Sequence, residues 1–536
     1  MKRNILYLAA AAVIALGFTS CNKDEKVDEG MQFRATMENT NAKTALVGTH
    51  INWVEGDEVM IYGTVQNGLY KATPDAEDAT VATLTKVGQQ VISNGGVFRA
   101  IYPAASAVSA TSFTIPAVQE SVDGSLANTF PMYAESYDEN LQFKNLCGVL
   151  KIHLQQEGAK VSRIVVTAAS EINGTFNINN SGEEPAISYN NGGNCTTTLL
   201  CSEAQDITNG KDFYIYMPAG EYSGLSIKLQ NEGYGVEKNA PANVAVEILR
   251  SQYSTLSFTN VNMPIPPDND HQWGLYSVSS TQQVWISPGN LQFNKTMGTY
   301  TTADQQTLNG TWRFAEHQYD RCGYTGHVGN VDGGNNNSST AWIDLFGWAT
   351  SGYNGYQPLP RNSYDHYVNF PLDEIGGTNY DWGVNMGDGW RTLTQAEWQC
   401  LVGSVGHVAA RNGKCGGATV CGVEGYILLP DLWDGPSIST GSPYTSNVYD
   451  AEAWAEMESY GAAFLPITGR KSGGTIYINH DGGYYWTTTA NGYGNTGRKL
   501  ATQGSFTNNG IGTGNGECEG QAAVRLCKNY VPASSK

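Results

Sequence analysis

The chain has 536 residues, which is too long for a single hydrophobic core and predicts about two to four domains. It holds 62 glycines and 30 tyrosines but only 15% charged residues, a composition that favours short strands and tight turns over long helices. The net charge of −19 argues against nucleic acid as a partner, because few cations remain to neutralise phosphates.

The first thirty residues have the pattern of an export signal. Lys2-Arg3 precede an apolar run that is too short to span a bilayer and leads through Phe-Thr-Ser to Cys21. This end resembles the lipobox of bacterial lipoproteins, whose cysteine takes a diacylglycerol; an ordinary secretory peptide is the alternative. The resemblance implies removal of residues 1–20, insertion of acylated Cys21 into the lipid bilayer, and a polar tether over residues 21–30 at the outer-membrane surface.

The ten cysteines allow disulfides in an oxidising compartment. Zinc is the rival interpretation, but no Cys-x-x-Cys or His-x-x-x-His motif accompanies them, so we expect no metal and no cofactor. Sequence does not fix the connectivity. The close pairs that are disulfide candidates are Cys195 with Cys201, Cys415 with Cys421, and Cys518 with Cys527.

Short apolar or alternating runs, bounded by Gly, Pro and Asn, fill the chain up to residue 262. They are typical of strands in antiparallel sandwiches, and the length predicts one β-sandwich over residues 31–140 and a second over residues 141–262. The expected strands are Glu58–Tyr62, Val97–Tyr102, Gly148–Leu154, Ser162–Thr167 and Asp212–Tyr216.

The order of short motifs in this half resembles fimbrillin-like proteins. These are β-sandwich lipoproteins of pili or surface assemblies, so the resemblance implies anchoring, spacing or assembly, with fimbrial subunits as partners. The motifs are Lys43-Thr44, Asn52-Trp53, Gly56-Asp57-Glu58-Val59, Phe113-Thr-Ile-Pro116, Gln119, Met132-Tyr133-Ala134, Phe143-Lys-Asn145, Val149-Leu-Lys-Ile152 and Tyr216-Met-Pro-Ala-Gly220.

A proline- and acid-rich segment at residues 263–270 predicts a stiff linker and the main domain boundary. The domain expected after it spans residues 271–530, is rich in Gly, Asn, Trp and Tyr, and is followed by a tail at 531–536. One helix is indicated there, because Thr394 can cap it while Glu397 reaches back to the cap. Its apolar residues recur on one face, so we expect it to pack on a sheet.

The segment Arg391–Trp398 is similar to formylglycine-generating-enzyme-like proteins, although Thr392 and Leu393 replace their Leu and Pro. The resemblance implies a C-type-lectin-like fold, and the whole motif set is more similar to lectin-fold domains of bacterial surface lipoproteins than to the enzyme. The expected fold class is therefore mainly β, with tandem N-terminal β-sandwiches and a C-terminal α+β C-type-lectin-like domain. Further motifs are Ser287–Phe293, Trp312–Glu316, Trp342–Trp348, Gly425–Asp431, Ala463–Pro466, Gly469-Arg470, Gly483–Thr488 and Ala523–Leu526.

Catalytic motifs are missing from the sequence. The Ser-Tyr-Cys-type copper motif of the oxidases, the calcium loops of the lectins, His-Glu-x-x-His, Gly-x-Ser-x-Gly and the phosphate-binding loop do not occur. Paired carboxylates for glycoside hydrolysis stay open, since they can be distant in sequence. We therefore expect no enzyme and name no catalytic residue.

The stretch from Tyr484 to Asn509 combines Tyr with Thr, Gly and Asn, residues that suit recognition of sugars or proteins. The alternative is that Trp486 is core and the Gly/Asn segments are only turns. The ligand-binding candidates are Tyr484, Tyr485, Asn491, Tyr493, Asn495 and Arg498.

Together these features predict an adhesin-like or fimbria-associated lipoprotein of the cell surface, whose non-catalytic head binds a glycan or a host or bacterial surface protein. A structural or anchoring component of a pilus without its own ligand is the first alternative. A formylglycine-generating-type oxidase, or a hydrolase on the same fold, is the second.

Overall fold

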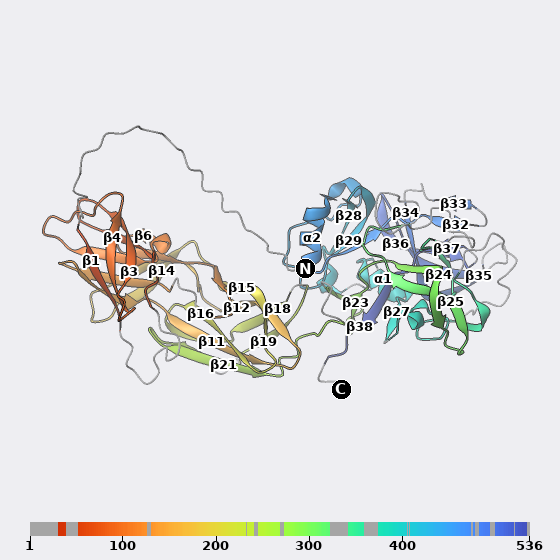
Figure 1. Ribbon diagram of the computed structural model, residues 1–536, viewed down its shortest axis with the longest axis horizontal. Coiled ribbons are helices and arrows are strands. Elements are labelled where there is room, and N and C mark those ends of the chain that lie inside the picture. The colour runs from red at the N-terminus through yellow and green to blue at the C-terminus, as the bar shows by residue number, and fades with distance from the viewer. Residues whose placement is uncertain are drawn as a thin grey trace.

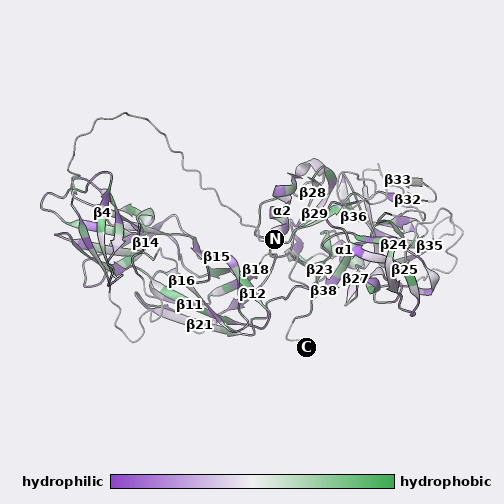
Figure 2. Ribbon diagram, viewed as in Figure 1, coloured by the Kyte–Doolittle hydropathy of each residue, from purple (hydrophilic) through white to green (hydrophobic). Residues whose placement is uncertain are grey.

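The structure is a computed structural model in which the chain folds into an elongated row of β-rich units (Figure 1). No helix in the described part of the chain is long and apolar enough to cross a membrane. Hydrophobic and hydrophilic residues are instead interleaved along the strands of every unit (Figure 2). The described residues are 31–38, 52–125, 130–231, 233–240, 245–267, 273–321, 341–358, 373–387, 389–404, 406, 408–472, 475–477, 482–493, 499–518 and 520–532.

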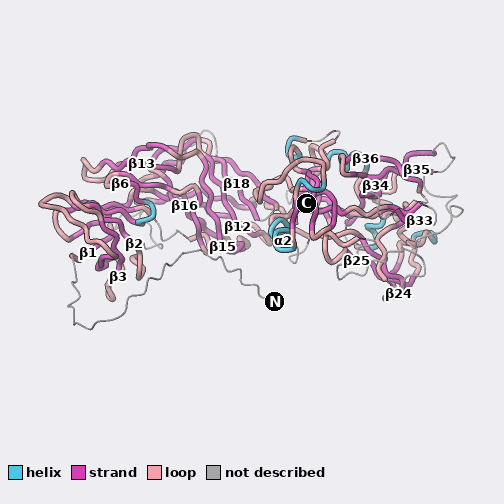
Figure 3. Tube along the Cα trace, turned by 90° about the horizontal axis from the view of Figure 1, so that it is seen from above, coloured by secondary structure: helices cyan, strands magenta, loops and turns pink. Residues whose placement is uncertain are grey.

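The predicted mainly β class is confirmed, since strands far outnumber the two short α-helices of the described residues (Figure 3). The reason is visible in single strands such as β2 (Glu58–Tyr62), where Val59 and Ile61 are fully buried and their neighbours are not. Alternation of this kind places one face of a strand in a core and the other in water. All five strands expected from such runs are present, with ends shifted by a few residues at most.

The first unit is a closed barrel with the strand order β1-β10-β9-β5-β2-β3-β4, where a β-sandwich was expected. A closed barrel has no open sheet edge. β1 closes it by pairing parallel with β10 and antiparallel with β4. Trp53 fills the interior with edge-on contacts to Tyr102 at 5.2 Å and Phe143 at 5.3 Å. The other strands are β1 (Phe33–Met37), β3 (Gly68–Pro74), β4 (Val81–Val87), β5 (Phe98–Tyr102), β9 (Met132–Ser136) and β10 (Asn140–Asn145).

The second unit is a sandwich of two sheets, β16-β11-β21 and β19-β18-β12-β15-β8, over a shared apolar core. The pair β17-β20 completes it, whereas the four-stranded sheet β14-β13-β7-β6 places its buried side chains in the core of the barrel. The strands of the sandwich are β8 (Val118–Ser121), β11 (Gly148–Gln155), β12 (Lys160–Thr167), β15 (Thr196–Asp206), β16 (Lys211–Met217), β17 (Gly220–Ser223), β18 (Ser226–Asn231), β19 (Tyr234–Asn239), β20 (Ala245–Ile248) and β21 (Tyr253–Thr259). The strands of the sheet that packs on the barrel are β6 (Ala107–Ser109), β7 (Ser112–Ile115), β13 (Gly174–Asn179) and β14 (Ala186–Asn191).

The predicted boundary at residue 140 is wrong. β8, which precedes it, pairs with β15 of the second unit, while β10 crosses it and belongs to the barrel. β13 and β14, which follow it, share a sheet with β6 and β7 whose buried side chains lie in the barrel core. The chain therefore visits the second unit before it completes the first. Composition and turn signals locate strands but do not identify their partners, because strand pairing here is long-range.

The C-terminal unit, called the head below, is built from small sheets and two helices, α1 (Gln395–Leu401) and α2 (Ala451–Ser459). α1 packs on the sheet β34-β35-β36, and the capping box predicted for Thr394 and Glu397 is confirmed. The strands are β22 (Leu275–Ser277), β23 (Gln283–Ile286), β24 (Leu291–Thr301), β25 (Thr307–Phe314), β26 (Phe346–Gly347), β27 (Trp390–Thr392), β28 (Cys415–Val420), β29 (Val423–Leu428), β30 (Val448–Tyr449), β31 (Ala463–Pro466), β32 (Arg470–Ser472), β33 (Thr475–Tyr477), β34 (Gly482–Tyr493), β35 (Lys499–Thr507), β36 (Gly510–Glu517), β37 (Gln521–Ala522) and β38 (Leu526–Asn529).

The segment predicted as a free linker begins inside the second unit. Met263 is 2% exposed, and the side-chain amide of Gln156 bonds its backbone N–H at 2.7 Å and its carbonyl at 2.8 Å. Trp273 and Trp285 of the head belong to the same apolar core as the second sandwich. The prediction of a stiff spacer that begins at residue 263 is therefore corrected: Met263 is anchored in the second unit, and the head packs directly against that unit. Residues 268–270 of the predicted linker lie outside the described residues.

Candidate functional site

The predicted binding stretch lies on β34 and β35, and one of its candidates is a core residue. Tyr485 is fully buried, donates its hydroxyl to the Pro466 carbonyl at 2.8 Å, and stacks on Trp398 with ring centroids 5.7 Å apart. Tyr485 is therefore excluded as a ligand contact. The reason is the two-residue period of a strand, which turns Tyr485 toward α1 and Tyr484 to the opposite face.

Three other candidates of this stretch reach the surface. Tyr484 is half-buried beneath the Arg470 guanidinium, whose carbon lies 5.1 Å from the ring centroid. Asn491 is exposed and donates to the side-chain oxygen of Asn515 at 2.7 Å, and Tyr493 is 60% exposed. Their role in binding stays a prediction. Asn495 and Arg498 lie outside the described residues.

The disulfide candidates are not joined in the structure, since Cys195, Cys201, Cys415 and Cys527 are free thiols, and every predicted pair contains at least one of them. Cys415 and Cys421 lie at opposite ends of β28, and an extended strand of that length holds their Cα atoms far beyond the roughly 7 Å that a disulfide tolerates. The same argument separates Cys195 from Cys201 along β15. The predicted disulfides are therefore wrong.

The lipidation residue Cys21, the leader and the tether all lie outside the described residues, so the lipid anchor stays a prediction. Within the described part of the chain, no three His, Cys, Asp or Glu side chains cluster as metal ligands do. Arg525 is a buried cation of the head, and burial lowers its pKa to about 10. It donates to the side-chain oxygens of Gln318 at 2.8 Å and Asn290 at 3.3 Å, which makes it a structural group of the head interior.

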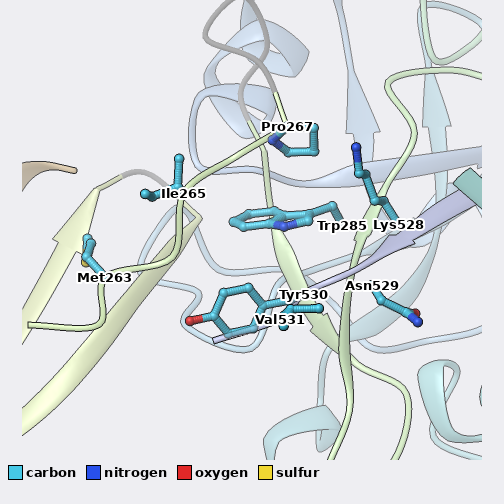
Figure 4. Close-up of a pocket in the computed structure, with 8 residues that line it drawn as sticks. All are labelled: Met263, Ile265, Pro267, Trp285, Lys528, Asn529, Tyr530 and Val531. Carbon is cyan, nitrogen blue, oxygen red and sulfur yellow. The ribbon is translucent and has the colours of Figure 1, made fainter. Parts of the chain in front are cut away.

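A groove of about 430 Å³ lies where the second sandwich meets the head, and we call it the junction groove (Figure 4). Small-molecule pockets have volumes of roughly 300–1,000 Å³, so its size suits a small ligand. One wall comes from the end of the sandwich and the other from β23, β38 and the residues after β38. The lining residues are Met263, Ile265, Pro267, Trp285, Lys528, Asn529, Tyr530 and Val531.

Trp285 is fixed at the centre of this junction. Its ring makes edge-on contacts with Tyr234 of the sandwich at 5.5 Å and with Tyr530 of the head at 6.1 Å. The indole N–H, which Figure 4 shows on the side of Tyr530, has no acceptor among the described residues. Trp285 therefore joins the two units and leaves one donor unused.

Polar groups of the junction groove are held from the head. Arg391 donates to the side-chain oxygen of Asn529 through Nε at 2.9 Å and through a terminal nitrogen at 2.7 Å. The other side of Arg391 is fixed by Glu397 at 2.6 Å. Because the amide oxygen of Asn529 is taken by two cationic donors, its NH₂ group is left for other partners. Lys528, beside it on β38, forms no ion pair with a described carboxylate.

The sequence did not identify this groove. Its residues come from a segment predicted as linker, one strand of the head, and the last strand with the predicted tail. No local motif joins them, because only the docking of two domains brings them together.

Comparisons with known proteins give distant structural neighbours only. No protein-family model matches the chain, and no curated protein matches it. A proposed cell adhesion protein from Bacteroides ovatus is 12% identical with a TM-score of 0.29, over 44% of this chain and 95% of that one. A fimbrial assembly protein from Parabacteroides distasonis is 10% identical with a TM-score of 0.24, over 48% and 94%. The minor pilin of Streptococcus agalactiae is 10% identical with a TM-score of 0.18, over 45% and 98%.

Proposed function

We propose that this chain is a cell-surface lipoprotein of the adhesin type. Acylated Cys21 anchors one end, and the non-catalytic head binds a glycan or a protein. The observation that carries the proposal is the position of the head. β1, which contains the first described residues, lies at one end of the row of units and the head at the other (Figures 1 and 3). A tether leaving before β1 therefore lets the head project away from a membrane.

Contacts between neighbouring units support this proposal, because a presented head needs a stalk whose units stay docked on one another. Between barrel and sandwich, Arg250 holds Glu38 through two hydrogen bonds of 2.7 and 2.8 Å. Between sandwich and head, Arg163 pairs with Asp434, and the backbone N–H of Leu275 donates to Gly233 at 3.3 Å. Charged, aromatic and backbone contacts thus connect all three units.

Binding is tested with the soluble chain from Met31 onward on an array of glycans and extracellular-matrix proteins. We expect saturable binding that is lost when Asn491 and Tyr493 are both changed to Ala. Tyr137→Ala is the matched control, because Tyr137 is 81% exposed but lies on the barrel. A silent array with a folded chain, or equal loss in the control, would favour a structural component of a surface assembly instead.

The anchor is tested separately by Cys21→Ser in the full chain. Loss of the acylated residue should move the protein from the membrane fraction to the soluble fraction, because the acyl chains supply the hydrophobic attachment. Retention in the membrane fraction would contradict lipidation at this cysteine.

A further inference from the structure

The junction groove holds side-chain hydrogen-bond donors that have no protein partner in the described part of the chain. The indole N–H of Trp285, the ammonium of Lys528 and the NH₂ group of Asn529 lack protein partners among the described residues. No Asp or Glu stands among its lining residues, and the side-chain oxygen of Asn529 is occupied by Arg391. Because donors require an acceptor-rich partner, this lining selects a ligand with oxygen acceptors and negative charge.

Lys528 carries a positive charge without a counter-ion among the described residues, in a chain that is strongly acidic. The protein has a net charge of −19, yet this half-buried ammonium has no carboxylate near enough for an ion pair among the described residues. A carboxylate placed in the groove would receive a charge-assisted hydrogen bond from Lys528, and Trp285, which is paired with Lys528 across the two strands, carries a further donor. A neutral sugar fits less well, because its hydroxyl donors would find few side-chain acceptors.

The remaining lining is apolar. Ile265 is 48% exposed and Val531 52% exposed, and they come from opposite walls of the groove. Tyr530 and the buried Met263 also line the groove (Figure 4). An apolar body lying here would remove both exposed aliphatic side chains from water, at about 25 cal/mol for each Å² covered.

We propose that the junction groove binds a small amphipathic carboxylate, with its apolar body between Ile265 and Val531 and its carboxylate at Lys528. This site is distinct from the adhesive surface of the head and does not depend on it. Since the ligand touches both walls, it also strengthens the docking of head on sandwich.

The test is isothermal titration of the soluble chain from Met31 onward with decanoate, below the concentration at which it forms micelles. Decanol and decyltrimethylammonium carry the same apolar chain with a neutral and a cationic end. We expect saturable one-site binding of decanoate and much weaker binding of the other two. Equal binding of all three would overturn the role of the donors, and no binding of decanoate would overturn the site.

Variants locate the site. Lys528→Gln should weaken decanoate binding roughly ten- to a hundredfold, as expected for loss of a hydrogen bond between charged groups. Trp285→Phe keeps an aromatic ring but removes the N–H, and it should cause a smaller loss. Lys86→Gln is the matched control, because Lys86 is a half-buried lysine of the distant strand β4. Equal effects of Lys528→Gln and Lys86→Gln would overturn the proposal, and the unfolding temperature of each unliganded variant shows that it is folded.

Discussion

The two junctions of the molecule are made in different ways. The barrel and the sandwich are joined by exchanged strands and a charged contact, in which Glu38 accepts from Arg250, from Ser251 at 2.9 Å and from the backbone of Asn145 at 3.0 Å. Among the described strands, the sandwich and the head share no sheet, and Trp285 lies in a core common to both. The first junction therefore depends on chain path and charge, and the second on close packing of preformed surfaces.

The packing junction should be the easier to break by removing a side chain. Trp285→Ala deletes the ring that contacts Tyr234 and Tyr530, and large-to-small changes of this kind cost about 3–5 kcal/mol. We expect the head to detach while both N-terminal units stay folded, which appears as a new protease-sensitive site near residues 263–272 and a larger radius of gyration. An unchanged radius of gyration with an unchanged digestion pattern would show that other contacts keep the head docked on the sandwich.

The charged junction should respond to pH. Burial alone would raise the pKa of Glu38, but hydrogen bonds from Arg250 and the Asn145 backbone, together with the Arg250 charge, lower the pKa overall. A carboxyl whose folded-state pKa is depressed adds stability above its unfolded pKa, near 4.3, and that stability is lost as pH falls through the folded value. Glu38→Gln should cost about 1.5–3 kcal/mol at pH 7 and much less at pH 3, measured by denaturant unfolding. Arg34→Gln, on exposed β1 surface, is the control; a pH-independent cost would contradict the ionic origin.

The backbones of the sandwich and the head approach closely at Gly233, which allows a second test of the packing junction. A Cβ at Gly233 of the sandwich would lie 2.5 Å from the Tyr460 carbonyl and 3.0 Å from the Cα atoms of Gly274 and Gly461 in the head. Gly233→Ala should therefore loosen the head by about 1–3 kcal/mol, the usual cost of overpacking. Gly512→Ala meets nothing within 4 Å and should be neutral. Equal thermal unfolding of the two variants would show that the junction is more yielding than its geometry indicates.

The smallest effect is expected on the head surface. Tyr493→Ala removes an exposed ring and should change the free energy of unfolding by less than about 0.5 kcal/mol, while it reduces adhesion if the predicted surface is used. A large loss of stability would instead make Tyr493 a structural residue.

Local patterns predicted local structure well. The strand at Glu58–Tyr62 and the helix cap at Thr394 follow from alternation and from one side-chain hydrogen bond, both contained in a few residues. Pairing partners were not predictable in this way: β8 lies beside β15, far along the chain, and β1 runs parallel to β10. The wrong prediction of Tyr485 as a ligand contact has a different origin. The composition of its segment suits binding, but its position in strand β34 buries the side chain.

The junction groove was beyond prediction for a third reason. Ile265 and Lys528 are separated in sequence by almost the whole head, and they line one groove only where the end of the second sandwich meets β23 and β38. Such a site is a property of the assembled domains rather than of any segment.

The parallel pairing of β1 with β10 also sets an order of events during synthesis. β1 is synthesised first, but its partner β10 lies at Asn140–Asn145, after β8, which belongs to the second unit. The barrel cannot close until β10 has been synthesised, and β8 has no partner until β15 follows. We therefore expect the two N-terminal units to become protease-resistant together, late in synthesis, rather than one after the other.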